Sequence, residues 1–251
     1  MSVRTIGIGI ADDAEKVIRS ISESGISSFV RAYAQDSTPE IPPGTGITLE
    51  VCTDPAGSLV ADLMDGHIDA AVRGTLPANT VLATLKKASG VQRLERAALL
   101  ETARGERFFL APVGVDEGWE IGERIELARK AQEMAVRFGL PERIGVLSGG
   151  RSGDIGRHPA VDRSLADAEL VARMTGGVHY QILIEDAVRD CGVIIAPDGI
   201  SGNLIFRTLI FLGSGRGHGA PVLNINRIFV DTSRATPDYA NAIRLADSLL
   251  K

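Results

Sequence analysis

Short apolar segments and amphipathic segments alternate along almost the whole chain. The apolar runs expected as strands are residues 5–10, 29–34, 47–52, 94–100, 106–113, 144–147 and 192–196. The expected helices end near residues 24, 65, 138, 212 and 250. A repeated strand-then-helix order needs crossover connections, which build a mostly parallel sheet covered by helices on both faces. The order therefore predicts an α/β protein with a three-layer αβα architecture.

The length of the chain limits how many such sheets it can build. Its 251 residues suffice for one large domain or for two of moderate size. Gly90 marks a boundary, because a full strand–helix series precedes it and a new one follows. We therefore expect two α/β domains, residues 1–90 with the returning segment 221–251 and residues 91–220, with a cleft between them. Clefts between domains are frequent ligand sites.

Charge and cysteine usage argue against several classes of protein. The net charge is −5 and the 27 basic residues are scattered, so a nucleic-acid partner is not expected. Cys52 and Cys191 lie in apolar contexts without paired spacing, which predicts reduced, buried thiols in a cytoplasmic protein. The apolar start reaches Asp12 and Asp13 too early for a signal peptide, and no membrane span follows. The four histidines are far apart, so no metal site is expected.

Residues 191–234 carry the pattern most typical of an active-site wall. A buried strand ends at Asp198, and a small-residue turn with Asn203 leads into an apolar helix. A second buried strand ends at the polar run 231–234, which contains Ser233 and Arg234. Because ligands of open α/β sheets bind at the carboxyl ends of strands, these four side chains are candidate site residues.

The pair Ser233-Arg234 admits two interpretations. A serine beside an arginine at a strand end can orient a nucleophile and neutralise negative charge on a phosphate or an oxyanion. Alternatively, Ser233, or Thr236 before Pro237, caps the final helix.

Arginines in two turns are candidates for holding an anion. The loop 148–157, SGGRSGDIGR, offers glycine N–H groups and Arg151, although it lacks the Gly-Lys-Ser/Thr end of a P-loop. The alternative interpretation is that residues 148–157 form a mobile surface loop that binds no ligand. Arg73 follows the apolar run 70–72 at a turn, and its alternative role is a salt bridge to Asp69 or a solvated charge at the edge of the sheet.

Two common enzyme patterns are missing from the sequence. The run 213–219, GSGRGHG, follows a helix and precedes a strand, the reverse of the order in a phosphate-binding turn, so we interpret it as a flexible connection. The chain also has no Gly-x-Ser-x-Gly element and no other Ser-His-Asp cue.

Taken in chain order, these elements resemble the phosphotransacylase superfamily, which contains phosphate acetyl- and butyryltransferases. The similar segments are 69–75, 137–148 with Ser152-Gly153, 195–198 with 201–203, and 219–221 with 231–234. The resemblance covers nearly all of the chain. It implies two domains of the isocitrate/isopropylmalate dehydrogenase-like fold, and we expect a homodimer.

Within that superfamily the chain most resembles the methanogenesis marker protein 4 group, whose members are labelled as methyltransferase subunits. Residues 7–12 and 149–154 carry this narrower similarity. It implies an archaeal protein of methanogenesis, for which a corrinoid protein is a candidate partner.

The resemblance also implies roles for individual residues. Ser233 and Arg234 would be catalytic. The substrate-binding residues would be Arg73, Ser148, Arg151, Ser152, Asp198 and Asn203, the last two by shaping their turn. Two departures concern the family's chemistry, in which arginines hold an acyl phosphate and an acid helps to deprotonate the thiol of coenzyme A. Residues 79–85 contain no arginine, and Ala235-Thr236-Pro237 displaces Asp238 from the position of that acid.

These observations predict a methanogenesis-associated transferase-like protein that binds an anionic or coenzyme-type small molecule in the inter-domain cleft. One alternative is a phosphate acyltransferase acting on coenzyme A thioesters, and another is a non-catalytic binding or assembly subunit. Coenzyme A and a methanogenic coenzyme are the candidate cofactors. The residues contain neither an S-adenosylmethionine fingerprint nor the ligands of a zinc-thiolate site.

Overall fold

The computed structural model describes residues 4–36, 40–41 and 43–250 of the chain. These fall into two compact units, Met1–Leu94 with His218–Lys251 (unit 1) and Glu95–Gly217 (unit 2). The boundaries lie close to residues 90 and 221 but not at them. Leu94 is buried in the core of unit 1, and Ala220 belongs to a strand of the unit 1 sheet.

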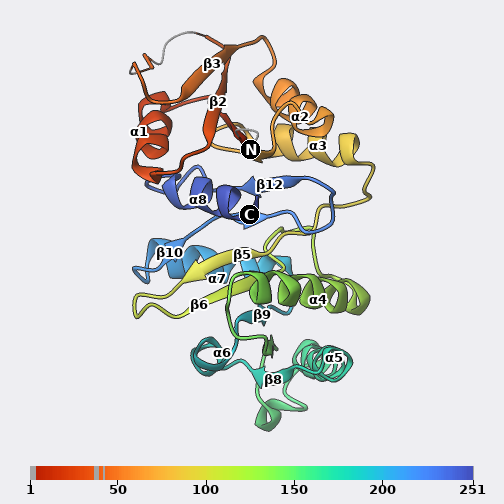
Figure 1. Ribbon diagram of the computed structural model, residues 1–251. Helices are drawn as coiled ribbons and strands as arrows, with labels where there is room; N and C mark the ends of the chain where they lie inside the picture. Colours follow the sequence, from red (N-terminus) through yellow and green to blue (C-terminus); the bar gives the residue numbers. More distant parts are fainter. Residues whose placement is uncertain (1–3, 37–39, 42, 251) are drawn as a thin grey trace. The chain divides into compact units, whose positions relative to one another are not determined.

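Unit 1 contains a six-stranded sheet in the order β11-β12-β4-β1-β2-β3; Figure 1 labels β2, β3 and β12 of this sheet. Its strands are β1 (Thr5–Gly9), β2 (Phe29–Ala34), β3 (Ile47–Val51), β4 (Ala70–Val72), β11 (Ala220–Pro221) and β12 (Ile228–Asp231). All pairs are parallel except β11 with β12. Val72 on β4 is in register with Ile8 on one side and Val230 on the other. The carboxyl ends of β1, β4 and β12 therefore meet at one edge.

Helices cover both faces of this sheet. They are α1 (Ala14–Ser24), α2 (Pro55–Asp65), α3 (Ala78–Ser89) and α8 (Ala240–Leu249), with α1 against α8 and α2 against α3 (Figure 1). Asp54 caps α2, because its Oδ1 accepts a hydrogen bond from the N–H of Gly57 at 3.0 Å. Strand residues such as Ile6 and Ile8 are fully buried between the layers, each contributing about 1.5–3 kcal/mol.

The last helix, α8, begins at Ala240, which is too far along the chain for Ser233 or Thr236 to be its N-cap. Tyr239 precedes α8 and makes no side-chain capping bond. The prediction that Ser233 or Thr236 caps this helix is therefore wrong. The Thr236 hydroxyl donates to the carbonyl of Ser233 at 2.7 Å, so both residues belong to a turn ahead of the helix.

The sheet of unit 2 has the order β10-β5-β6-β9-β7-β8. Its strands are β5 (Ala98–Glu101), β6 (Arg107–Ala111), β7 (Ile144–Leu147), β8 (Val178–Gln181), β9 (Val193–Ile195) and β10 (Arg216–Gly217). The four strands β6, β9, β7 and β8 are parallel, so their carboxyl ends share an edge. The run 213–219 is more than the predicted connection, since β10 within it pairs with β5.

The helices of unit 2 complete a second αβα arrangement. They are α4 (Ile121–Arg137), α5 (Pro159–Thr175), α6 (Ile184–Asp190) and α7 (Gly199–Phe211), with a short 3-10 turn at Ser152–Asp154. Helices α4 and α5 pack on each other, while α6 and α7 contact the strands β7 and β6. The predicted α/β class with mostly parallel sheets is therefore confirmed for each unit.

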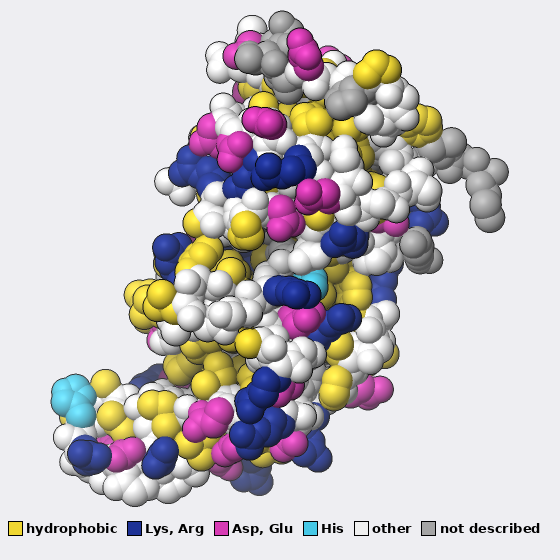
Figure 2. Space-filling model, turned by 90° about the vertical axis from the view of Figure 1, so that its left-hand side faces the viewer, with side chains coloured by type: hydrophobic (Ala, Val, Ile, Leu, Met, Phe, Trp, Pro, Cys, Tyr) yellow, Lys and Arg dark blue, Asp and Glu magenta, His cyan; other side chains and the backbone are white. Residues whose placement is uncertain are grey.

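The cysteines, the surface charges and the helix lengths can be compared with the expectations from the sequence. Cys191 is buried, but Cys52 is only partly buried, and both thiols are free. Basic side chains are interspersed with acidic and hydrophobic ones on the face drawn in Figure 2. Within the described residues, no helix is both long enough and apolar enough to cross a membrane.

Candidate functional site

The edge of unit 1 holds a buried ion pair between two strand ends. Arg73, which follows β4, donates from Nε to Oδ1 of Asp231 at the end of β12, at 2.5 Å. Its Nη1 donates to the carbonyl of Leu76 at 2.6 Å. The two side chains are only 4% and 12% exposed. Arg73 therefore pairs with Asp231 and not with Asp69, whose carboxylate accepts the N–H of Thr5.

The turn beside Arg73 requires a glycine. Gly74 has φ 62°, and a Cβ there would lie 2.1 Å from the carbonyl oxygen of Gly9 at the end of β1. A glycine alone lets the two strand ends approach so closely. The hydroxyl of Thr232 then reaches the carbonyl of Gly74 at 3.0 Å, which ties the β12 end to the same turn.

Ser233 and Arg234 continue from this edge. The Ser233 hydroxyl accepts the N–H of Ala235 at 3.3 Å, and the Arg234 side chain is exposed. Lys16 on α1 donates from Nζ to the carbonyl of Arg234 at 3.2 Å. A positive side chain therefore lies close to the predicted catalytic pair.

Tyr239 lies next to this group and was missed by the sequence reasoning. Its side chain is buried, its hydroxyl has no hydrogen-bond partner in the described part of the chain, and Lys16 Nζ lies 4.7 Å from its ring centroid. Burial raises the pKa of Tyr239 to about 12, while the charge of Arg73 acts in the opposite direction. No local pattern marks this residue, because it stands alone between a turn and a helix.

The edge of unit 2 contains a chain of three polar side chains. Ser148 follows β7 and is only 3% exposed. Its Oγ lies 2.9 Å from Nε2 of His179 on β8, and Nδ1 of the same ring lies 3.2 Å from Oε2 of Glu169 on α5. The sequence carries no local cue to this Ser-His-acid arrangement, because its three residues come from separate elements.

A bulge and a helix position this chain, which we call the Ser148–His179–Glu169 relay. The β7–β8 register shifts between Val146 and Leu147, and bulges commonly re-aim side chains near functional sites. The N–H of Gly149 donates to Ser164 Oγ on α5 at 2.8 Å, which holds the loop after Ser148 against that helix.

A pocket of about 310 Å³ opens beside the relay. It is lined by Ser152, Ile155, Asp162, Leu165, Ala166, Glu169 and His179. The Ser152 hydroxyl accepts Nε2 of Gln181 at 3.1 Å. Arg151 is exposed on the same loop, and its N–H donates to Oδ2 of Asp154 at 2.9 Å. That backbone bond, with help from Arg157, lowers the pKa of Asp154.

The two remaining predicted residues stabilise the start of α7. Oδ1 of Asp198 accepts the N–H of Ser201 at 2.8 Å, so Asp198 is the N-cap of the helix. Nδ2 of Asn203 donates to the carbonyl of Val113 at 3.0 Å and holds the loop that follows β6. Both contacts shape the strand-end turns, and a contact of either residue with a ligand stays a prediction.

A buried carboxylate in the same loop was also missed. Oε1 of Glu117 accepts Nε of Arg96 at 2.6 Å, and its Oε2 accepts the N–H of Gly114. Burial raises the pKa of Glu117, and the charge of Arg96 opposes this effect. Glu117 therefore stabilises the loop that follows β6, the same loop to which Asn203 is hydrogen-bonded.

The predicted site residues thus divide between the units. Arg73, Ser233 and Arg234 belong to unit 1, and Ser148, Arg151, Ser152, Asp198 and Asn203 belong to unit 2. That both groups face one cleft stays a prediction. Among the described residues, no group of three or more His, Cys, Asp or Glu side chains could hold a metal ion.

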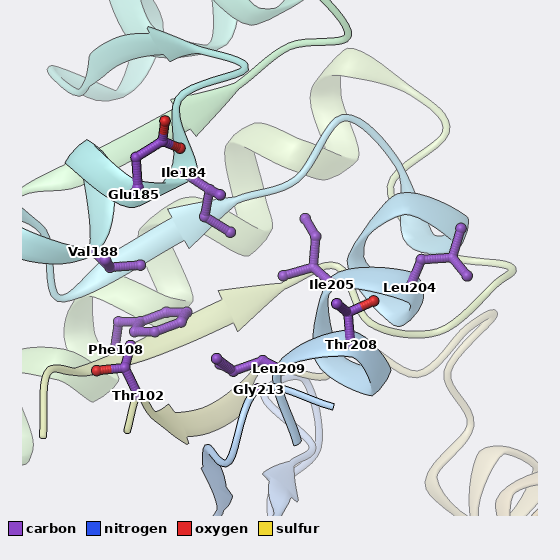
Figure 3. Close-up of a pocket in the computed structure, with 10 residues that line it drawn as sticks. All are labelled: Thr102, Phe108, Ile184, Glu185, Val188, Leu204, Ile205, Thr208, Leu209 and Gly213. Atoms are coloured by element: carbon purple, nitrogen blue, oxygen red, sulfur yellow. The ribbon is translucent and has the colours of Figure 1, made fainter. Parts of the chain in front are cut away.

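A second hollow of about 450 Å³ lies on the other face of the unit 2 sheet. Its lining is almost entirely apolar and comes from β6, α6 and α7, with Thr102 just after β5 and Gly213 just after α7. Figure 3 shows side chains of α6 and α7, including Ile184, Ile205 and Leu209, around this hollow. Leu204 of this lining is 60% exposed, and Leu212 at the end of α7 is 83% exposed. Such an apolar surface is typical of an interaction site.

Comparison with known proteins gives close relatives. The chain is 46% identical over 251 residues to the protein named "Putative methyltransferase mtx subunit X" of Methanosarcina barkeri, with 97% of this chain and 92% of that protein covered. It is 46% identical to the protein of the same name in Methanosarcina mazei, with 97% and 89% covered. No family model matches the chain.

Comparison with solved structures identifies the fold. A branched-chain phosphotransacylase from Enterococcus faecalis superposes with a TM-score of 0.76 at 15% identity, covering 98% of each chain. A phosphotransacetylase from Streptococcus pyogenes gives 0.68 at 16% identity, covering 99% of this chain and 95% of that one. The fold is therefore phosphotransacylase-like, as the sequence resemblance implied.

Proposed function

Because the chain belongs to the family of the methyltransferase mtx subunit X proteins, we propose that it is a methanogenesis-associated transferase that binds an anionic or coenzyme-type small molecule. The names of its relatives support group transfer, and so does a fold shared with acyltransferases. We assign the anion-binding role to Ser233 and Arg234 at the edge of unit 1.

One observation carries this assignment. Arg73 is buried and held by Asp231 and Leu76, whereas Arg234 is exposed at the same strand ends. An exposed guanidinium can form paired hydrogen bonds with a phosphate or carboxylate. Lys16 adds a second positive charge, because its Nζ donates to the backbone carbonyl of Arg234. Arg73 then supports the turn, and Arg234 meets the ligand.

A thermal-shift screen tests the proposal with coenzyme A, acetyl phosphate, S-adenosylmethionine and methanogenic coenzymes. A ligand at about 100 times its dissociation constant adds roughly 2.7 kcal/mol of stability. We expect Arg234→Ala and Ser233→Ala to abolish the shift while the unliganded melting temperature stays unchanged. Arg19→Ala, at an exposed position of α1, is the matched control. If Arg234→Ala binds as tightly as the wild type, the assignment is wrong.

Phosphate acyl transfer is the second candidate, and the fold favours it. Acyl phosphate formation from an acyl-coenzyme A and phosphate would establish it. Methyl turnover together with co-purification of a corrinoid protein would instead support the role in the relatives' names. A chain that shows neither reaction while it still binds a partner protein would act as a non-catalytic subunit.

For the partner, we propose a second copy of this chain bound through α7. Only Gly199 and Gly202 of this helix are buried, and Arg207 is its single charged residue. The helix supplies the protruding side chain of Leu204 and a wall of the apolar hollow, and the exposed Leu212 follows at its end (Figure 3). A two-fold interface needs such a self-complementary surface. Its depletion of charge is typical of interface cores.

Light scattering with size-exclusion chromatography tests this partner. The wild type should have the mass of a dimer, and Leu204→Glu should have that of a monomer. Val136→Glu changes an apolar residue on α4 that is also at least half exposed, and this variant should remain dimeric. A monomeric wild type would refute the proposal.

A further inference from the structure

We propose that Ser148 is a nucleophile activated by His179, and that the pocket beside them accepts an uncharged short-chain ester or thioester. The inference concerns unit 2 alone and needs neither methyl transfer nor the anion site at Arg234. It would give this unit a covalent acyl-transfer activity.

The first support is the geometry of the proton path. The Ser148 Oγ–His179 Nε2 distance of 2.9 Å lies within the range expected for a nucleophile and its base. The Glu169 carboxylate accepts from Nδ1 at 3.2 Å. A neutral imidazole whose Nδ1 carries the proton must leave Nε2 as an acceptor. Glu169 therefore selects the tautomer that can take the proton of Ser148.

The second support is a competing acceptor for the same proton. The Ser148 hydroxyl can also donate to the carbonyl of Gly150, at 3.0 Å. When His179 is protonated, both ring nitrogens are donors. The hydroxyl then turns to Gly150 and loses its base. The charge of His179 thus decides whether Ser148 is ready to react.

The pocket gives the third support and defines the substrate class. His179 and Ser152 both line its 310 Å³, which suits a small acyl group. Ser152 Oγ accepts from Gln181, so its own proton is available to a carbonyl oxygen that develops negative charge. Asp162 and Glu169 also line the pocket, and two carboxylates repel an anion such as an acyl phosphate. An uncharged ester or thioester fits this lining better.

The reaction balances with water as the only co-reactant. Ser148 Oγ attacks the carbonyl carbon while its proton moves to His179 Nε2. The bond to the leaving oxygen or sulfur breaks, and His179 returns the proton to that atom, which leaves an acyl-serine ester. Water then attacks the ester, His179 takes a proton from the water, and Ser148 departs as the restored hydroxyl. The net change is an ester and water giving an acid and an alcohol or thiol.

A fluorophosphonate probe on the intact protein provides the test, because it phosphonylates activated serines. We expect one label, mapped to Ser148 by peptide mass spectrometry, and a labelling rate that depends on pH. His179→Asn should slow labelling by about 100-fold and flatten the pH profile. Glu169→Gln, which alters a positioning residue, should shift that profile. Ser214→Ala, at an exposed loop position, should label like the wild type.

The mapping decides the question on wild-type protein, so it does not depend on a variant that folds. A label on Ser148 together with loss of 4-nitrophenyl acetate hydrolysis in Ser148→Ala supports the inference. An unlabelled Ser148, a label confined to another residue, or a pH profile unchanged in His179→Asn would overturn it.

Discussion

Unit 1 and unit 2 each gather polar side chains where neighbouring parallel strands end, but they leave these groups in different states. In unit 1, Arg73 and Asp231 are buried and satisfy each other. In unit 2, Ser148 and His179 are hydrogen-bonded beside a pocket, and the outermost partner, Glu169, is exposed. The carboxyl ends of the parallel strands therefore carry a stabilising ion pair in unit 1 and a hydrogen-bonded Ser-His pair beside a pocket in unit 2.

The largest effect should come from the buried pair of unit 1. Asp231→Ala leaves the Arg73 charge buried without its partner, which should cost about 3–5 kcal/mol of unfolding free energy. Glu169→Gln removes the exposed end of the relay in unit 2 and should cost less than about 1 kcal/mol. Urea unfolding measures both. Equal losses would refute the contrast between the two edges.

Asp65→Ala is the control in unit 1. Its side chain is exposed at the end of α2, so its loss should change stability by no more than about 0.5 kcal/mol. A large loss in this variant would mean that unit 1 is sensitive to any change, and the cost of Asp231→Ala would then not report on the pair.

A smaller loss should follow from filling the close backbone contacts at the two edges. A Cβ at Gly202 would lie 1.9 Å from the carbonyl oxygen of Pro112, and one at Gly74 would lie 2.1 Å from that of Gly9. Gly202→Ala and Gly74→Ala should each cost about 1–3 kcal/mol. Gly122→Ala, in open space on α4, should instead stabilise by about 0.5–1 kcal/mol. Chemical unfolding of all three variants separates the cost of a clash between the new Cβ and the backbone from the effect of replacing a glycine in general.

The fold could be predicted from the sequence wherever an element has strong apolar contrast. The strand at 144–147 is fully buried, and α4 ends within one residue of the predicted end near residue 138. Helix α5 was missed because small residues such as Ala168 and Ala172 form its buried face, which weakens the periodic signal. Strand β8 was missed because it is short and only partly buried.

The candidate site was predictable only where one strand end carries several polar residues together. Ser233 and Arg234 stand next to each other after β12, so a local pattern marks them. Ser148, Glu169 and His179 come from β7, α5 and β8, and they meet only when β8 pairs with β7 through its bulge. Their separation in sequence hides a contact that the tertiary structure creates.

The helix caps allow a finer comparison of the units. Asp198 caps α7 in unit 2 and Asp54 caps α2 in unit 1, each through a backbone N–H three residues on. Asp198→Ala and Asp54→Ala should each cost about 1 kcal/mol in thermal unfolding. Asp198→Asn keeps a capping oxygen and should recover most of that loss. If Asp198→Ala leaves stability unchanged but abolishes ligand binding, Asp198 contacts the ligand and is not a cap.

The smallest effects concern the pH dependence of stability. One carboxyl group in each unit should contribute to it, and the two contributions should change in opposite directions. In unit 1, burial would raise the pKa of Asp62, but hydrogen bonds from Tyr33, Arg31 and His67 outweigh it and lower the pKa below 3.8. The stability from Asp62 is therefore present above that pH and is lost as the pH falls through the lowered folded pKa. In unit 2, burial raises the pKa of Glu117 above 4.5. The stability that the Glu117 carboxyl group contributes is present below that pH and is lost as the pH rises through the raised folded pKa.

Urea unfolding between about pH 3 and pH 7 separates these two carboxyl groups. The advantage of the wild type over Asp62→Asn should shrink toward acid pH, because the hydrogen bonds from Tyr33 and Arg31 favour the charged carboxylate. The advantage over Glu117→Gln should shrink toward neutral pH, because burial disfavours the charged form even beside Arg96. Slopes of the same sign for both variants would mean that the Arg96 charge outweighs burial at Glu117. The buried acid of unit 2 would then behave like the paired acid of unit 1.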